Sequence, residues 1–287
     1  MNQNIALVLE GGGFRGAYTA GAMKWLAEHN LKFKYTVAIS ATAIYGFYYA
    51  ADRIQQMEEI STKGIKDPCM IGIQPLIREQ ALVGYNAMRE KYLMPTYNEI
   101  LDELRQSDRD IEVGLYNMTR QQLEYYNKNQ LDEDGQMLKA TCVLPLSNRM
   151  TEVNGNKYLD GGIEVMVSCQ RAMDTGHEKM LVIVTKDKNY VRKPNGFFLT
   201  ALLRMVYHKF EKMLDQLDKR TQAYYDQMDQ VYKLEEEGKA LLIRPSNGCG
   251  VGRFTGSLKQ LEQLFQVGWQ DMEDRKDEIM AFLEDNR

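Results

Sequence analysis

The sequence predicts an α/β protein whose central sheet is mostly parallel. Residues 5–9 form a short apolar run with a glycine cluster directly behind it, as in a buried strand that ends in a tight loop. Tyr18, Ala22 and Trp25 then follow at helical spacing, and residues 35–39 repeat the strand pattern. A strand, a helix and a second strand in this order form a βαβ unit, which implies parallel strands and a right-handed crossover.

The next segments indicate helices that cover this sheet. Residues 41–51 continue without a strong breaker, so Ser40 stands where the second strand turns into a helix. From 52 to 110 the pattern is mostly helical, with Pro68 and Pro75 among its interruptions. We expect helices and loops over the sheet here.

The remainder of the chain adds more strands and a helical end. Asn154-Gly155 is a strong signal for a hairpin turn. Strands are expected at 111–116, 122–126, 151–153, 157–159, 179–185 and 240–243, and helices at 170–174, 197–234 (with one break at most) and 258–282. We find neither a linker rich in Gly, Ser or Pro nor an internal repeat. The prediction is one domain over 1–287, with an α/β core in 1–195 and a mostly helical extension in 196–287.

Composition excludes several classes of function. The formal net charge is −4, from 40 acidic and 36 basic residues, which argues against nucleic acid as a partner. Four widely separated cysteines signal neither a zinc site nor a disulfide framework and fit a reducing cytosol. The N-terminus lacks a signal-peptide pattern, and no run approaches the about 18 apolar residues of a spanning helix. We expect a cytoplasmic protein, and peripheral contact with a membrane stays open.

A glycine loop follows the first strand. Gly11, Gly12, Gly13, Phe14, Arg15 and Gly16 match the letters GxGxxG. A dinucleotide site would need an acidic residue after the second strand, and a Walker loop would need Lys where Ala17 stands. The loop does offer backbone N–H groups at a helix N-terminus, which would suit an oxyanion. A plain turn between strand and helix is the alternative.

Ser40 and Asp160 are the candidate reactive residues. Ser40 sits in the pattern of a nucleophile elbow, G-x-S-x-G, although residues 38–42 read A-I-S-A-T. Alone, such a serine is more often a helix N-cap. Asp160 lies in Tyr158-Leu159-Asp160-Gly161-Gly162, which alone would be an ordinary turn.

Together, these motifs resemble the patatin-like phospholipase family, in particular its bacterial branch. The family hallmarks are a GGGxRG loop, a GxSxG serine and a DG[GA] aspartate, and residues 139–145 and 185–194 are also similar. The resemblance implies a three-layer fold and a Ser-Asp dyad that cleaves lipid or small ester substrates without a cofactor or metal. Ser40 would be the nucleophile, Asp160 the base, and Gly11, Gly12, Gly13 and Arg15 the oxyanion loop.

Two features bear on whether such a site would be active. Ala38 and Thr42 replace the glycines of the elbow, and Gly162 is followed by residues 163–168, which contain no proline where relatives usually have several. The alternative function is therefore a catalytically impaired protein that binds lipid or a protein partner. A Ser-His-Asp triad has no supporting motif, because His29, His177 and His208 are placed as surface or packing residues.

Overall fold

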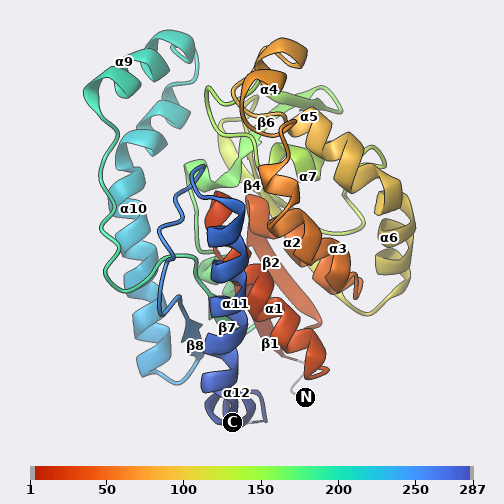
Figure 1. Ribbon diagram of the computed structural model, residues 1–287. Coiled ribbons are helices and arrows are strands. Elements are labelled where there is room, and N and C mark those ends of the chain that lie inside the picture. Colours follow the sequence, from red (N-terminus) through yellow and green to blue (C-terminus); the bar gives the residue numbers. More distant parts are fainter. Residues whose placement is uncertain (1–3, 285–287) are drawn as a thin grey trace.

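The computed structural model describes residues 4–284, which contain one eight-stranded sheet (Figure 1). Hydrogen-bonded neighbours follow the order β5-β6-β3-β2-β1-β7-β8, and β4 also pairs with β3. The strands are β1 (Ile5–Leu9), β2 (Tyr35–Ile39), β3 (Asp110–Asn117), β4 (Gln122–Tyr126), β5 (Thr151–Val153), β6 (Asn156–Asp160), β7 (Lys179–Ile183) and β8 (Ala240–Ile243). The pairs from β3 through β2, β1 and β7 to β8 are parallel, whereas β4, β5 and β6 pair antiparallel. The predicted α/β class is confirmed.

One edge of β3 is shared by two strands. Residues 113–117 of β3 pair with β4 along one edge of the strand. Since the same residues also pair with β2 or with β6, these two strands lie along the other edge of β3. The β2 pairing extends to Gly114, which stands opposite Ile39, and β6 takes over at Leu115, which stands opposite Asp160. This register brings the end of β2 and the end of β6 together.

Helices cover both faces of the sheet. They are α1 (Gly16–Glu28), α2 (Ala41–Ala50), α3 (Ile54–Ser61), α4 (Ile73–Arg78), α5 (Tyr85–Met88), α6 (Met94–Gln106), α7 (Gln136–Ala140), α8 (Cys169–Asp174), α9 (Phe197–Val206), α10 (Glu211–Glu236), α11 (Leu258–Asp274) and α12 (Lys276–Glu284). Single turns occur at η1 (Gly13–Arg15), η2 (Gly64–Lys66), η3 (Arg89–Leu93) and η4 (Gly161–Ile163). Among these helices, none in residues 4–284 is long and apolar enough to cross a bilayer.

The alternation of side chains along the strands divides the interior into two cores. In β1, Ile5, Leu7 and Leu9 belong to the larger core, which includes buried residues of α1, α2 and α11. Ala6 and Val8 belong to the smaller core, which α8 and α10 cover from the other face. In Figure 1, α1 and α11 stand in front of the strands, and α10 runs beside them. The result is a three-layer arrangement of helices, sheet and helices.

One helical prediction is confirmed, and two helices differ from the prediction. The 197–234 segment is broken once, between α9 and α10, as allowed. The closing helix, expected to be continuous, is divided at Arg275, whose guanidinium donates to Leu242 O at 2.6 Å. The short helix α7 carried no periodic signal and was not predicted. These two differences arise from tertiary contacts rather than local pattern.

Helix α11 lies directly against α1 through two glycines. A Cβ on Gly21 would lie 1.9 Å from Phe265 O, and one on Gly268 would lie 2.1 Å from Tyr18 O. No larger side chain fits at either position without moving a backbone. The C-terminal helices are thus joined closely to the first βαβ unit.

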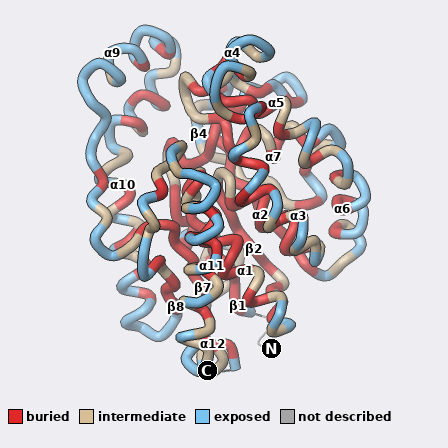
Figure 2. The backbone as a smooth tube through the Cα atoms, viewed as in Figure 1, coloured by how far each residue is buried: buried red, intermediate tan, exposed pale blue. Residues whose placement is uncertain are grey.

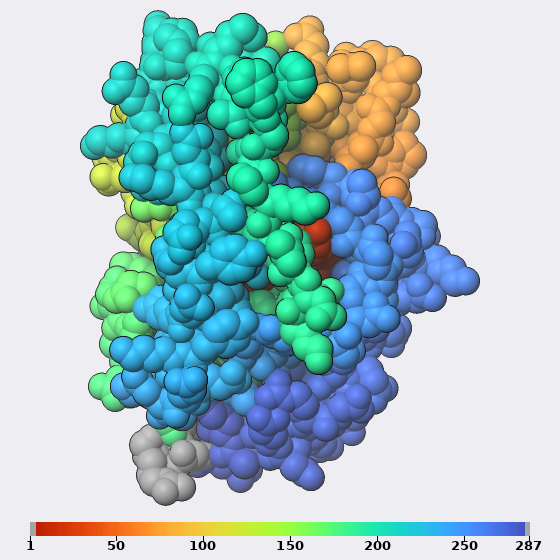
Figure 3. Space-filling model, turned by 90° about the vertical axis from the view of Figure 1, so that its left-hand side faces the viewer, coloured from red at the N-terminus to blue at the C-terminus, as the bar shows by residue number. Residues whose placement is uncertain are grey.

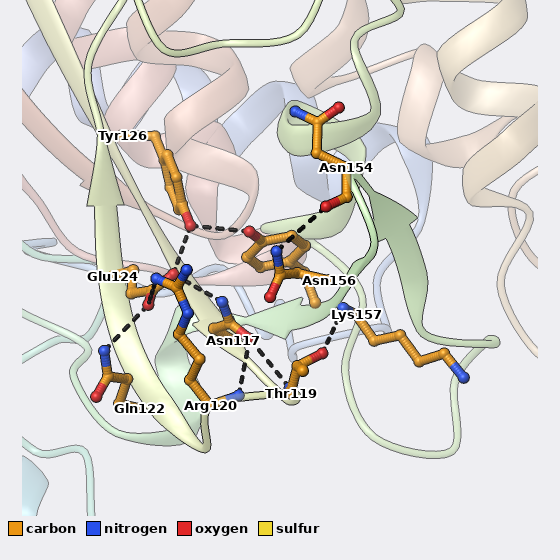
Figure 4. A network of polar contacts seen from close by, with 10 residues as sticks. Asn117, Thr119, Arg120, Gln122, Glu124, Tyr126, Asn154, Asn156 and Lys157 are labelled. Atoms are coloured by element: carbon orange, nitrogen blue, oxygen red, sulfur yellow. Dashed lines mark hydrogen bonds and ion pairs between the residues drawn. The ribbon is translucent and has the colours of Figure 1, made fainter.

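A network of polar side chains joins β3, β4 and β6 (Figure 4). The Glu124 carboxylate accepts hydrogen bonds from four side chains, those of Asn117, Arg120, Gln122 and Tyr126. Burial raises the pKa of Glu124, but these donors outweigh burial and lower it overall. The Tyr126 hydroxyl also lies 2.9 Å from that of Tyr158, two residues before Asp160. The strand that carries Asp160 is therefore anchored to β4.

Candidate active site

Ser40 occupies a strained elbow between β2 and α2. Its backbone has φ 64° and ψ −143°, a combination that residues with a side chain rarely adopt. The side chain makes no capping hydrogen bond to α2, so the N-cap interpretation gains no support. Instead the backbone N–H donates to Thr141 Oγ1 at 2.9 Å. The turn has the strained strand-to-helix form that exposes a nucleophile.

Thr42 is accommodated by hydrogen bonds in the close packing behind the elbow. It is fully buried, and its hydroxyl lies 2.8 Å from Ile39 O and 3.1 Å from Glu10 O. The hydroxyl thus links the ends of β1 and β2. A glycine at this position would save space but would lose that link.

Asp160 stands beside Ser40 at the end of β6. Its side chain is buried, and Oδ1 accepts the Gly162 N–H at 2.7 Å. Desolvation raises the pKa of Asp160. The nearby Ser40 hydroxyl, the Gly162 N–H and the charges of Arg220 and Arg253 lower this pKa but do not cancel the rise. A buried carboxyl with a raised pKa next to a hydroxyl has the properties of a general base.

The glycine loop presents two uncommitted N–H groups. The Gly11 N–H donates to Met166 O at 3.2 Å, and the Arg15 N–H donates to Gly12 O at 3.3 Å. Within residues 4–284, the N–H groups of Gly12 and Gly13 have no hydrogen-bond acceptor. All four residues line the same pocket as Ser40, but only these two N–H groups are available to an oxyanion.

A buried ion pair is formed by Glu10, the residue directly before the glycine loop. The Lys186 ammonium contacts the Glu10 carboxylate, and both side chains are almost completely buried. The N–H and hydroxyl of Thr185 donate to the other Glu10 oxygen at 2.6 and 2.8 Å. Burial lowers the pKa of Lys186 to about 8, although Glu10 opposes that shift. The segment after β7 is therefore fixed against the end of β1.

The comparisons with known proteins agree with this arrangement. The sequence model described as patatin-like phospholipase matches residues 7–168, more than half of the chain, and this range includes Ser40 and Asp160. The chain belongs to the patatin-like phospholipase family. Membership supports hydrolysis of lipid esters as the general class of activity. No curated protein matches the sequence.

Two further comparisons concern the fold and the C-terminal part of this patatin-like protein. The crystal structure of VipD from Legionella pneumophila aligns with a TM-score of 0.53 at 14% identity, covering 96% of this chain and 67% of that one. At this identity the likeness concerns the fold alone. Residues 210–284 match a domain of unknown function (DUF6363).

The patatin-like site opens into a pocket whose lining residues are of two chemical kinds. Its empty volume is about 860 Å³, including the part open to solvent. The apolar lining residues include Ile44, Ile60, Ile65, Met70, Val83 and Met88. The basic lining residues are Arg15, Lys186, Arg192, Arg220 and Arg253. Figure 3 shows N-terminal atoms, in red, at the floor of a hollow between the green segment and the blue C-terminal part.

The histidines are placed away from this chemistry. His29 stacks on Trp25, and His177 stacks on Tyr35, with ring centroids 4.0 and 4.3 Å apart. Neither these residues nor His208 lines the pocket. Within residues 4–284, no group of three or more His, Cys, Asp or Glu side chains is arranged to hold a metal ion.

Several site residues had no signal of their own in the sequence. Arg192, Arg220 and Arg253 reach the pocket from the loop after β7, from α10 and from the loop before α11. Thr141 lies in the 139–145 segment that resembles the family, but no rule of spacing links it to Ser40. Ala41, which also lines the pocket, supplies the first N–H after the elbow, a usual oxyanion donor.

Proposed function

We propose that this patatin-like protein is a serine acyl hydrolase that cleaves carboxylic esters of lipids. The observation that carries the proposal is the meeting of Ser40, in a strained elbow, with the buried Asp160 in one pocket beside the glycine loop. The apolar residues that line the pocket suit an acyl chain.

The proposed reaction has two steps. Ser40 Oγ attacks the ester carbonyl while Asp160 accepts the hydroxyl proton, and the Gly12 and Gly13 N–H groups stabilise the oxyanion. Asp160 then returns the proton to the leaving alcohol, which leaves an acyl-serine. A water molecule, deprotonated by Asp160, attacks the acyl-serine. As the bond to Ser40 Oγ breaks, Asp160 gives this proton to Oγ, which releases the carboxylic acid and regenerates both residues.

The alternative is a patatin-like protein that binds lipid without turnover. Thr42 is hydrogen-bonded rather than strained, and the donors and base of the reaction line one pocket, so the local geometry favours the hydrolase. The two functions differ in whether Ser40 is reactive.

Covalent labelling of Ser40 distinguishes the hydrolase from a protein that only binds lipid. Full-length protein is treated with a fluorophosphonate probe, alongside Ser40→Ala and Asp160→Asn. We expect the parent to label, Ser40→Ala to remain unlabelled, and Asp160→Asn to label slowly while retaining the parent's circular dichroism spectrum. Equal labelling of Ser40→Ala would exclude this nucleophile, and an unlabelled parent would favour the binding function.

We further propose that the protein works at a lipid surface from the cytoplasmic side. Exposed apolar side chains gather on α4 and α9, which Figure 2 shows mostly in the exposed colour: Ile73, Leu76, Ile77, Phe197, Phe198 and Met205. Val191 and Leu82, also exposed, directly adjoin the pocket residues Arg192 and Val83. Two exposed apolar residues are therefore sequence neighbours of residues that line the pocket, which suits extraction of a lipid from a membrane. The four free cysteines support the cytoplasmic location.

We also propose that the chain folds as one domain. α11 packs against α1 through Gly21 and Gly268, and α10 covers the opposite face of the sheet. Removal of residues 196–287 would expose both faces, so we expect the shortened chain to be insoluble.

A further inference from the structure

Four arginines from separate parts of the chain converge on the pocket. Arg15 belongs to the glycine loop, Arg192 to the segment after β7, Arg220 to α10 and Arg253 to the loop before α11. Two of them, Arg220 and Arg253, come from the region that matches a domain of unknown function. That region therefore takes part in the site.

These arginines have no carboxylate partner of their own. Among residues 4–284, none of the four forms an ion pair, whereas Lys186 is neutralised by Glu10. Arg192 is only 8% exposed, and its guanidinium makes no hydrogen bond within the described part of the chain. Of the carboxylates in the described part of the chain, Asp160 is the one that lines the pocket. Basic groups therefore outnumber acidic ones, although the whole chain carries a net charge of −4.

The positive charges act on one another. Burial lowers the pKa of Arg220, and the charges of Arg253 and Arg192 lower it further. Arg15 lies over the Tyr190 ring at 5.3 Å, and Arg192 lies over the Tyr224 ring at 5.3 Å, so aromatic faces hold the guanidiniums in place. Asp160 is the nearby counter-charge, but these partly buried positive charges outnumber it, which favours the binding of a further anion.

The C-terminal region also holds the glycine loop. Arg253 O accepts the Phe14 N–H at 2.9 Å, and Arg220 Nε donates to Gly162 O at 2.5 Å. One contact is to the oxyanion loop and the other is to the turn after Asp160. An anion bound by these arginines would lie beside the reactive residues.

We propose that Arg15, Arg192, Arg220 and Arg253 form a subsite for a phosphate-type anion, which the C-terminal region completes. Because apolar residues line the same pocket, this subsite suits an amphiphile with an acyl chain and a phosphate group. Guanidinium groups match phosphate because their N–H donors can bind two oxygens at once. The substrate class rests on the proposed function, but anion binding does not require turnover.

Calorimetric titration of full-length Ser40→Ala tests this subsite without hydrolysis. The ligands are hexyl phosphate, inorganic phosphate and hexanol at low salt. We expect saturable binding of hexyl phosphate that weakens as NaCl is added. Adding Arg192→Gln or Arg253→Gln should weaken binding by about tenfold or more, because each removes a charge-assisted contact. Lys193→Gln removes an exposed neighbouring charge and is the matched control, with unchanged binding.

The outcomes separate the sources of the anion. Tighter binding of hexyl phosphate than of inorganic phosphate assigns the subsite to a lipid head group, and equal binding assigns it to a free phosphate. Thermal unfolding checks each variant. If Arg192→Gln does not fold, the more exposed Arg253→Gln decides. Equal binding of hexanol, or unchanged binding by the folded Gln variants, overturns the subsite. Failure of the Ser40 labelling experiment would overturn the hydrolase while leaving anion binding intact.

Discussion

The backbone N–H of Ser40 donates to the hydroxyl of Thr141 at 2.9 Å, and the same hydroxyl donates to Gly114 O at 2.9 Å. Gly114 is the last β3 residue to pair with β2, and the next residue, Leu115, stands opposite Asp160. One buried threonine thus connects the strained elbow to the strand that positions the carboxylate. Its contact is to the backbone of Ser40, so Thr141 is a positioning residue.

Thr141→Val should lower ester turnover more than it lowers ester binding. The substitution nearly preserves shape but leaves the Ser40 N–H without its acceptor, which costs about 1–3 kcal/mol. We expect kcat for a p-nitrophenyl ester to fall by about tenfold or more while KM changes little. Thr141→Ser keeps the hydroxyl and should retain most of kcat. An unchanged kcat in Thr141→Val would show that the hydrogen bond does not position Ser40.

The pH dependence of kcat/KM should report Asp160. Its pKa is raised above the ordinary value of 3.8, so the base is protonated, and activity is lost, at a higher pH than for an exposed carboxyl. Because the Arg220 charge lowers this pKa, Arg220→Gln should move the acid limb to higher pH. An acid limb that stays in place in Arg220→Gln would contradict the electrostatic coupling.

Folding stability should respond to pH with the corresponding sign. The folded protein binds the Asp160 proton more tightly than the unfolded chain does. The resulting stabilisation is complete below the unfolded pKa and is lost as pH rises through the folded pKa. Chemical denaturation of Asp160→Asn should therefore lack this component of the pH dependence. Identical pH profiles for the parent and Asp160→Asn would contradict the raised pKa.

Gly12→Ala should impair catalysis through the oxyanion loop. A Cβ on Gly12 would lie 2.7–2.8 Å from the side-chain atoms of Thr185, which Glu10 holds in place. The loop must then move, and loss of one oxyanion donor costs about 3 kcal/mol of barrier, or about a hundredfold in kcat. Gly196→Ala is the control, because a Cβ there meets no atom within 4 Å. Equal kcat in the two variants would remove Gly12 from the proposed mechanism.

Local patterns predicted the parts of the site that lie in short motifs. Ser40 was a candidate because hydrophobic periodicity predicts a strand-to-helix turn there, and Asp160 was a candidate because its turn belongs to a recognised motif. The register along β3 that joins them depends on β6 returning antiparallel after more than forty residues, and no periodicity encodes such a pairing. Arg220 and Arg253 could not be predicted for the same reason, since each is an ordinary basic residue until the C-terminal region folds back, and the family resemblance of 185–194 gave Arg192 no particular role.

At Thr42, by contrast, the elbow motif suggested an impaired site, because threonine replaces a glycine of the motif. A β-branched residue behind the elbow conflicts with the glycine of the family pattern. The conflict is relieved by two backbone carbonyls, those of Ile39 and Glu10, which only the folded sheet brings together. A side chain that violates a motif can therefore be compensated by hydrogen bonds that the motif does not describe.

Substitution of the exposed phenylalanines of α9 should weaken binding to lipid vesicles. Phe197 and Phe198 are 81% and 88% exposed, and burial of each ring in a bilayer interface is worth about 1.5–3 kcal/mol. Phe197→Ser/Phe198→Ser should lower the partition coefficient for phosphatidylcholine vesicles by about a hundredfold or more, because the two contributions add. Leu258→Ser, an exposed apolar residue on α11, is the matched control and should bind as the parent does.

In the double variant, turnover of a water-soluble ester should be retained, since neither ring lines the pocket, whereas turnover of vesicle lipid should fall with binding. Parent-like sedimentation of the double variant with vesicles would show that α9 is not the docking surface.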